Sequence, residues 1–119
     1  MKVEEFGDQY PDLPEEAHQR AQARFAPLQG WLYREHLDLN PWAEEEAGMG
    51  DIGDDALDTY QDIKRGLLLH DAGLPLHALW FWSYMHWVHW GRHAAGAAYA
   101  IHCLRSNGEL GARREDEGL

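Results

Sequence analysis

Two stretches decide the fold of this chain: DIGDDALDTYQDIKRGLLLHD at residues 51–71 and LHALWFWSYMHWVHWGRHAAGAAYAIHCLR at residues 76–105. Each has the length of a helix and apolar residues at helical spacing. Between them, Gly73 is placed as a helix C-cap and Pro75 follows it, which predicts a short connection. The first helix should present one apolar side, formed by Ala56, Tyr60, Ile63 and Leu67. The second should present one long stripe, formed by Leu79, Trp82, His86, His89, Trp90, His93, Ala97, Ile101 and Leu104.

The sequence that precedes these helices predicts shorter ones. A helix can begin at Pro14, which suits a first-turn position and is followed by two glutamates that complement the helix dipole. Pro27 and Gly30 interrupt the helical pattern, so we expect a kink or a separate second helix at residues 31–37. Residues 38–50 combine proline, glycine and like charges, and are expected to form a loop.

A chain of 119 residues is the size of one domain and can bury one hydrophobic core. No strand-like alternation of useful length is apparent, and short loops favour antiparallel neighbouring helices. We therefore expect an all-α fold, an antiparallel helical bundle of three long or four shorter helices, at residues 14–105. Residues 1–13 are expected to form an N-terminal arm and residues 106–119 a mobile polar tail.

Composition restricts the partners and the compartment. The chain has 10 basic and 21 acidic residues, a net charge of −11, which repels nucleic acid and anionic lipid. Basic proteins and metal cations remain possible partners. The five histidines and two arginines of residues 76–105 argue against a membrane span. The single cysteine, Cys103, cannot form an internal disulfide, and we identify no signal peptide, so we expect a cytoplasmic protein.

Charge is segregated between the two long helices. Residues 38–62 hold nine acidic side chains and no basic one, whereas residues 76–105 hold no acidic side chain. Several histidines share the apolar stripe of their helix, and buried imidazoles need hydrogen-bond partners. Those partners must come from another helix, from backbone carbonyls, from water or from a bound ion.

His89 and His93, four residues apart, project from one face of their helix and are candidate ligands of a divalent transition metal, together with Asp58. Facing helices of a bundle are a known setting for such sites. The acidic side chains available for binding are Asp54, Asp55, Asp58 and Asp62. One objection stands: if Tyr60 and Ile63 face the core, these aspartates face away from it. A metal site then requires a second surface, from a dimer partner or the N-terminal helix, that covers the acidic side.

The alternatives remain open at this point. The aspartates can form a solvated helix face, and the histidines can be satisfied core or boundary residues. Aspartate is a poor helix former, however, and close aspartates repel one another, which favours a role for them. The leading hypothesis is a non-catalytic binding or assembly module in which the Asp and His helices form a polar seam, with a homodimer that uses Trp87 as one form of it. A separate idea is that the acidic face mimics nucleic acid or docks a basic protein. The rival is a metal-binding helical bundle, of which a metal-dependent hydrolase is one form, that uses His89 and His93 with Asp55, Asp58 or Asp62.

Two runs, DDALDTYQDIKRGLLLHDAG at residues 54–73 and ALWFWSYMHWVHWGRHA at residues 78–94, resemble an uncharacterised bacterial family of small helical domains, a domain of unknown function. The resemblance implies a helical fold and supplies no activity. His86 falls outside the shared pattern. The matching positions are Asp54, Asp55, Asp58, Tyr60, Asp62, Lys64, Gly66, Leu67, Trp80, Trp82, His89, Trp90, Gly91 and His93.

Overall fold

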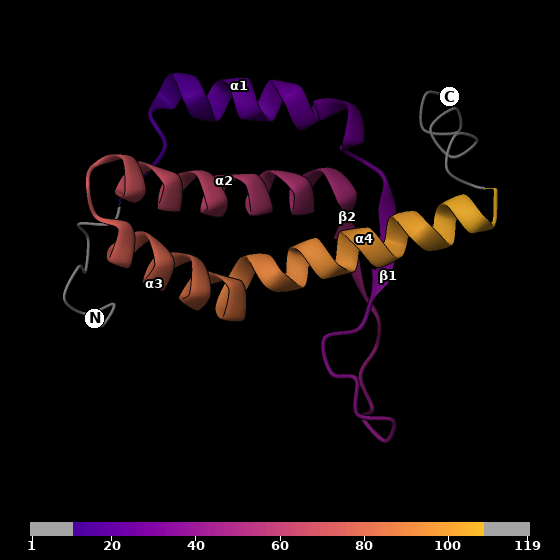
Figure 1. Ribbon diagram of the computed structural model, residues 1–119. Coiled ribbons are helices and arrows are strands. Elements are labelled where there is room, and N and C mark those ends of the chain that lie inside the picture. Colours follow the sequence, from indigo (N-terminus) through magenta and orange to yellow (C-terminus); the bar gives the residue numbers. More distant parts are fainter. Residues whose placement is uncertain (1–10, 109–119) are drawn as a thin grey trace.

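The computed structural model describes residues 11–108, which form three helical segments and a β-hairpin (Figure 1). The third segment is continuous, because a π-turn at His86–Trp90 joins two α-helices. In chain order the elements are α1 (Glu15–Phe25) with a 3₁₀ turn (Ala26–Leu28), β1 (Leu32–Glu35), β2 (Gly48–Asp51), α2 (Ile52–Asp71), α3 (Pro75–Met85) and α4 (Gly91–Ser106).

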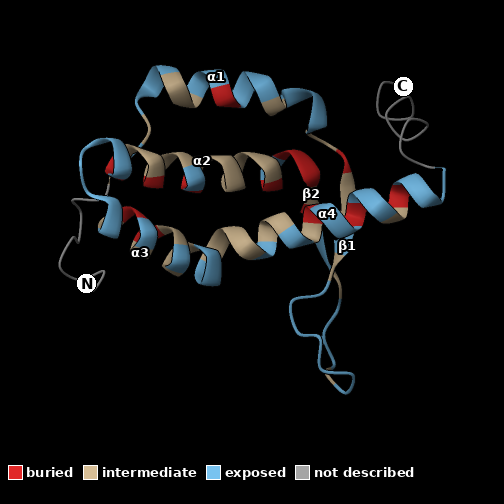
Figure 2. Ribbon diagram, in the orientation of Figure 1, coloured by how far each residue is buried: buried red, intermediate tan, exposed pale blue. Residues whose placement is uncertain are grey.

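Helix α2 lies between α1 on one side and α3 and α4 on the other (Figure 1). Consecutive helical segments run in opposite directions; the connection from α2 to α3 is short, as predicted, whereas the hairpin joins α1 to α2. On the α1 side, the Phe25 and Tyr60 rings meet edge to face at 5.7 Å, and Gln61 donates to His18 Nδ1 over 2.5 Å. The buried residues of α2 and α4 lie on the surfaces that face other elements (Figure 2). Both sides of α2 are therefore covered within one chain.

The β-hairpin corrects the predicted fold class. The expected helix at residues 31–37 is wrong, because β1 pairs antiparallel with β2, with Tyr33 opposite Gly50. A strand of four residues is too short to show a clear alternation of apolar and polar positions. The paired strand β2 is rich in glycine, a composition typical of loops. In the structure, Gly50 leaves the space that the Tyr33 ring fills. A Cβ there would lie 2.3 Å from Tyr33 Cζ.

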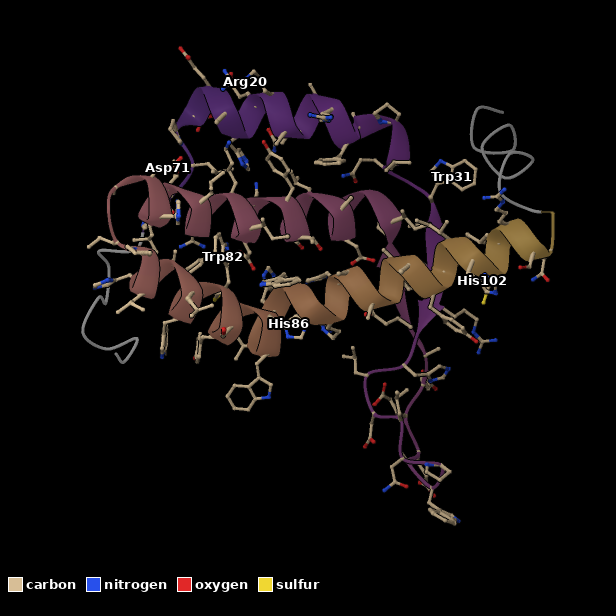
Figure 3. All side chains as sticks on the ribbon, viewed as in Figure 1. Arg20, Trp31, Asp71, Trp82, His86 and His102 are labelled. Atoms are coloured by element: carbon tan, nitrogen blue, oxygen red, sulfur yellow. The ribbon has the colours of Figure 1, made fainter. Side chains whose placement is uncertain are left out.

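Two apolar clusters lie toward opposite ends of α2. Near the hairpin, the buried side chains of Trp31, Ile52, Ala100 and Leu104 pack together. At the other end, Leu69, Ala78 and Phe81 form a second cluster, with Trp82 and Met85 against it. Trp82 projects from α3 toward α2 (Figure 3), where its indole N–H donates to the Ile63 carbonyl over 2.9 Å. This crossing depends on Gly66, whose Cβ would lie 2.0 Å from the Trp82 indole nitrogen.

The π-turn determines which side chains of the third segment face α2. From Phe81 to Ala97 the inward residues recur in steps of four, and each such step drifts by about 40° in an ideal α-helix. The i→i+5 hydrogen bonds of a π-turn wind the chain more slowly and offset this drift. The single stripe predicted for an uninterrupted helix is therefore wrong in part: Leu79, His86 and Ile101 are exposed, whereas Leu104 is buried as predicted.

The predicted helix ends agree with the structure. Gly73 and Gly108 both have positive φ, at 83° and 73°, and follow the last residues of α2 and α4. The predicted arm and tail lie mostly outside the described residues. Within the described part, Pro11 and Asp12 contact α2, because Arg65 Nε donates to the Pro11 carbonyl over 2.8 Å and its guanidinium lies 3.6 Å from Asp12. Among residues 11–108, no helix is both long and apolar enough to cross a membrane.

Gly91→Ala tests the π-turn. The Gly91 N–H donates to the His86 carbonyl, and an added Cβ would lie 2.3 Å from that same oxygen. We expect a loss of about 1–3 kcal/mol in the free energy of unfolding, measured by urea denaturation, because backbone must move. Gly48→Ala is the control, since its Cβ would lie an ordinary 3.7 Å from Glu35 O. Equal stability of Gly91→Ala and wild type would contradict the assigned π-turn.

Candidate metal centre

Helices α2 and the π-turn–α4 segment bring two carboxylates against two imidazoles. His89 Nδ1 lies 2.5 Å from Asp62 Oδ2, and His93 Nδ1 lies 2.6 Å from Asp55 Oδ1. Both aspartates are buried, with 4% of Asp55 and 3% of Asp62 exposed. An ionised carboxylate can only accept, so each Nδ1–H donates. Hydrogen bonds to an ionised acceptor are charge-assisted, and they offset the cost of burying the carboxylates.

The objection raised by the helical phase of α2 is resolved by the position of that helix. Its Tyr60 side faces α1, and its Asp55 and Asp62 side faces the histidines. The N-terminal helix thus covers the apolar side, while the acidic side is covered by the histidine helix itself. Ile63, predicted for the core, is 43% exposed.

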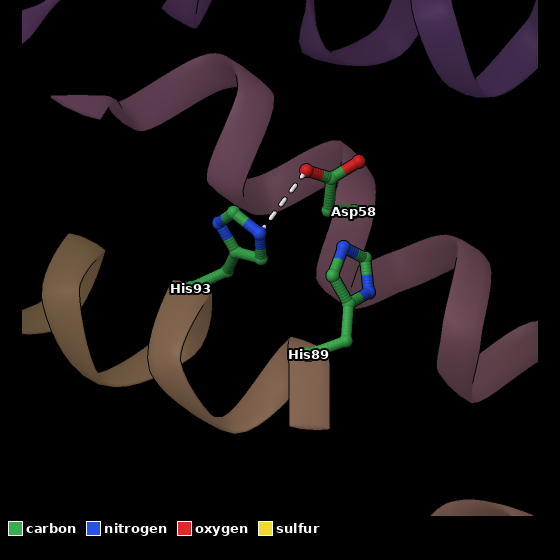
Figure 4. Close-up of side chains that lie close together, drawn as sticks. All are labelled: Asp58, His89 and His93. Carbon is green, nitrogen blue, oxygen red and sulfur yellow. Dashed lines mark ion pairs between the residues drawn. The ribbon is translucent and has the colours of Figure 1, made fainter. Parts of the chain in front are cut away.

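The two hydrogen bonds at Nδ1 leave each Nε2 with its lone pair directed away from the supporting aspartate. His93 Nε2 lies 3.4 Å from Asp58 Oδ2. The two rings meet edge to face at 4.7 Å, and both point toward the Asp58 carboxylate (Figure 4). One ligand atom from each of these three residues lies within 4.8 Å of the other two. Within residues 11–108, this trio is the one group of three or more such side chains close enough to hold a metal ion.

Each supporting aspartate has a second partner from elsewhere in the chain. The Tyr33 hydroxyl, from β1, donates to Asp55 Oδ2. The Arg65 guanidinium, from α2, lies 3.8 Å from Asp62 Oδ1 and stacks over the Phe81 ring at 5.1 Å. Burial and the adjacent Asp55 raise the pKa of Tyr33, so its hydroxyl stays protonated and remains a donor.

Asp58 lies between solvent and the two part-buried Asp–His pairs. The exposed fraction is 34% for the Asp58 side chain and 36% for the His89 side chain. Burial raises the pKa of Asp58, against the opposing effects of His93 and His89. The trio therefore has an open side at which an ion or a small ligand can enter.

The predicted site residues divide into three groups. His89, His93 and Asp58 come together as predicted, with Asp55 and Asp62 as their hydrogen-bonded supports. Asp54 is exposed near the start of α2, and Trp87 is 81% exposed on the π-turn. His86 packs edge to face on Trp90 at 4.6 Å and does not join the trio.

Sequence reasoning missed Tyr33 and Arg65. Arg65 stands three residues after Asp62, a spacing at which helical side chains meet, so this partner could have been found. Tyr33 carried no such signal, because its strand was predicted as a helix.

Asp58→Asn tests the electrostatics of the site. A carboxyl whose pKa is higher in the folded than in the unfolded state destabilises the fold when ionised, and this effect disappears below its unfolded pKa. We expect Asp58→Asn to stabilise the metal-free protein at pH 7–8 by up to about 1 kcal/mol, a small amount because the side chain is partly exposed. The gain in Tm should shrink as the pH falls through the range in which Asp58 titrates.

Asp54→Asn removes the same charge from an exposed position on the same helix and is the matched control. An equal gain in Tm for the two variants, or a gain from Asp58→Asn that does not change with pH, would contradict the role of burial.

No curated protein and no solved structure matches the chain. One protein-family profile does match, over residues 9–107, and its description is "Domain of unknown function (DUF5063)". The matched span contains every helix and strand described above and all residues of the trio and its supports. The family resemblance of the two helical runs is thereby confirmed, and the chain belongs to the DUF5063 family.

Proposed function

We propose that this domain binds one divalent transition metal ion through His89 Nε2, His93 Nε2 and the Asp58 carboxylate. The observation that carries the proposal is the convergence of two imidazoles, each held at Nδ1 by a buried aspartate, on a third carboxylate. Metal-binding histidines characteristically donate their other ring N–H to a carboxylate or carbonyl, which fixes the tautomer and the ring orientation.

The distances fit a metal centre after small side-chain rotations. Ligand atoms at about 2.0–2.1 Å from one ion lie about 3–3.5 Å apart. The His93–Asp58 separation of 3.4 Å already falls in that range, and all three ligand atoms lie within 4.8 Å. His89 is the most exposed of the three and has the most freedom to move inward.

The donor set restricts the metal and its chemistry. Two imidazoles and one carboxylate suit Zn²⁺, Fe²⁺ and related ions, and are a poor set for Ca²⁺ or Mg²⁺, which prefer oxygen. Three protein ligands are typical of catalytic rather than structural zinc, since a position is left for water. The enzymatic form of this proposal is a metal-dependent hydrolase. Its substrate would reach the metal from the exposed side of the trio, at Asp58 and His89.

Metal binding is tested on protein purified without a histidine tag. We expect about one Zn²⁺, Fe²⁺ or Mn²⁺ per chain by elemental analysis, and a Tm that rises when the metal is restored to chelator-treated protein. His89→Ala/His93→Ala should lose both the metal and the rise in Tm. Loss of one supporting carboxylate, in Asp62→Asn, should weaken affinity by about 10–100-fold.

His102→Ala is the control, because His102 is an exposed histidine farther along α4 (Figure 3). A metal content far below one ion per chain, together with a Tm that no added metal changes, would contradict the proposal. So would equal binding by His102→Ala and the double variant.

A second candidate function, self-association, is favoured by the outer face of α3 and the π-turn. Residues 76–91 contain no Asp, Glu, Lys or Arg, although the chain carries a net charge of −11. The exposed apolar side chains of this face include Leu76, Leu79, Trp87 and Val88. Two copies of the protein can bring such faces together without like-charge repulsion, which opposes contact elsewhere on an acidic surface.

Trp87→Ala tests this second candidate. We expect light scattering across a concentration series to show a dimer for wild type and a shift toward monomer for the variant, because a large exposed aromatic is lost from the contact. Trp42→Ala is the control, since Trp42 is 85% exposed in the loop of the hairpin. A wild-type protein that stays monomeric, or an equal shift in both variants, would contradict the dimer.

A further inference from the structure

We propose that Tyr33, on the β-hairpin, is a positioning residue for His93 and acts through Asp55; this inference rests on the metal centre proposed above. The Tyr33 hydroxyl donates to Asp55 Oδ2, and Asp55 Oδ1 accepts from His93 Nδ1 over 2.6 Å. The three side chains come from β1, α2 and α4. A continuous chain of hydrogen bonds therefore runs from the hairpin to a candidate metal ligand.

Both oxygens of Asp55 are used in this chain. The carboxylate is 4% exposed, so rotation about its side-chain bonds would break a hydrogen bond in a buried setting. Tyr33 thus fixes the plane of the carboxylate, and the carboxylate fixes the plane of the His93 ring. The high pKa of the Tyr33 phenol keeps its proton in place across the physiological pH range.

Two glycines hold Tyr33 in this position. An added Cβ at Gly50 would lie 2.3–2.7 Å from atoms of the Tyr33 ring, and one at Gly96 would lie 2.9 Å from its hydroxyl oxygen. Gly50 is on the paired strand and Gly96 is on α4, so the absence of side chains on two separate elements makes room for this tyrosine. A side chain at either glycine would displace the tyrosine from Asp55.

The arrangement around His89 differs. Its supporting aspartate, Asp62, is contacted by Arg65 of the same helix at 3.8 Å, and no part of the hairpin is involved. Tyr33 also lines an open apolar groove of about 650 Å³ between the hairpin and α4, which Tyr99 borders as well. Tyr99 borders the same groove but is 73% exposed, so it provides the comparison for loss of a tyrosine hydroxyl from this surface.

The test is a double-mutant cycle on metal affinity. Tyr33→Phe should weaken Zn²⁺ or Co²⁺ binding by about threefold to tenfold, less than the 10–100-fold typical of a group bonded directly to a ligand. It should have no further effect in an Asp55→Asn background and its full effect in an Asp62→Asn background. The visible absorption of bound Co²⁺ should also change in Tyr33→Phe. Tyr99→Phe should leave affinity and spectrum unchanged.

An effect of Tyr33→Phe that is equal in all three backgrounds would overturn the proposal, because it would reflect stability alone. So would affinity and a Co²⁺ spectrum identical to those of Tyr99→Phe. Gly96→Ala is the second variant if Tyr33→Phe does not fold. Its Cβ presses on the hydroxyl and should weaken metal binding in the same direction.

Nitrogen-15 NMR of the metal-free protein separates failure of this inference from failure of the metal proposal. In wild type the His93 ring should show a single tautomer with a slowly exchanging Nδ1 proton. Tyr33→Phe should speed that exchange at His93 and leave His89 unchanged, whether or not the protein binds metal. Equal exchange at His93 in wild type and Tyr33→Phe would overturn the positioning role. A wild type that shows the expected exchange pattern but binds no metal would overturn only the proposed function.

Discussion

The pairing of Asp55 and Asp62 with His93 and His89 is the interaction on which the rest of the structure depends. A buried carboxylate without a partner costs several kcal/mol, so α2 can turn these residues inward only where imidazoles meet them. The acidic helix and the histidine helix therefore depend on each other, although Arg65 of α2 also lies 3.8 Å from Asp62. Apolar clusters at the two ends of α2 supply the packing, while the polar seam fixes the register of the helices. A shift by one residue would break both aspartate–histidine hydrogen bonds.

This register explains features that are unfavourable locally. Gly66 and Gly91 lower helix propensity, but Gly66 admits the Trp82 indole and Gly91 admits the π-turn. The π-turn in turn keeps His89 and His93 facing α2 between Phe81 and Ala97. Such turns often mark functional sites, and this one supplies the more exposed of the two histidines. The register that requires these two glycines, despite their low helix propensity, is thus the same register that places His89 and His93 against α2.

The trio could be predicted because its three residues lie on helices, where sequence spacing determines the direction of each side chain. The helical period and the segregation of charge were enough to select His89, His93 and Asp58. The sequence required a second surface to cover the acidic side of α2, and both sides are covered, but by other elements than expected: the histidine helix covers the acidic side and α1 covers the Tyr60 side. Burial on both sides depends on α1, whose docking no local pattern reveals. Leu79 and Ile101 were misplaced because a π-turn leaves no clear mark in the apolar pattern. Tyr33 was out of reach, because β1 is a strand only through its pairing with β2, in which Tyr33 lies opposite Gly50.

The second partners of the two aspartates make the histidines unequal. Arg65 is a full cation near Asp62, also shared with Asp12 and the Pro11 carbonyl, and it draws on the carboxylate that His89 needs. Tyr33 is neutral and donates a direct hydrogen bond to Asp55, whereas the Arg65 guanidinium lies 3.8 Å from Asp62. Burial follows the same order, with 17% of the His93 side chain exposed against 36% for His89. A centre built in this way has one rigid imidazole, anchored to the hairpin, and one that can adjust. The adjustable side is also the open side, where Asp58 meets solvent and an incoming ligand must approach.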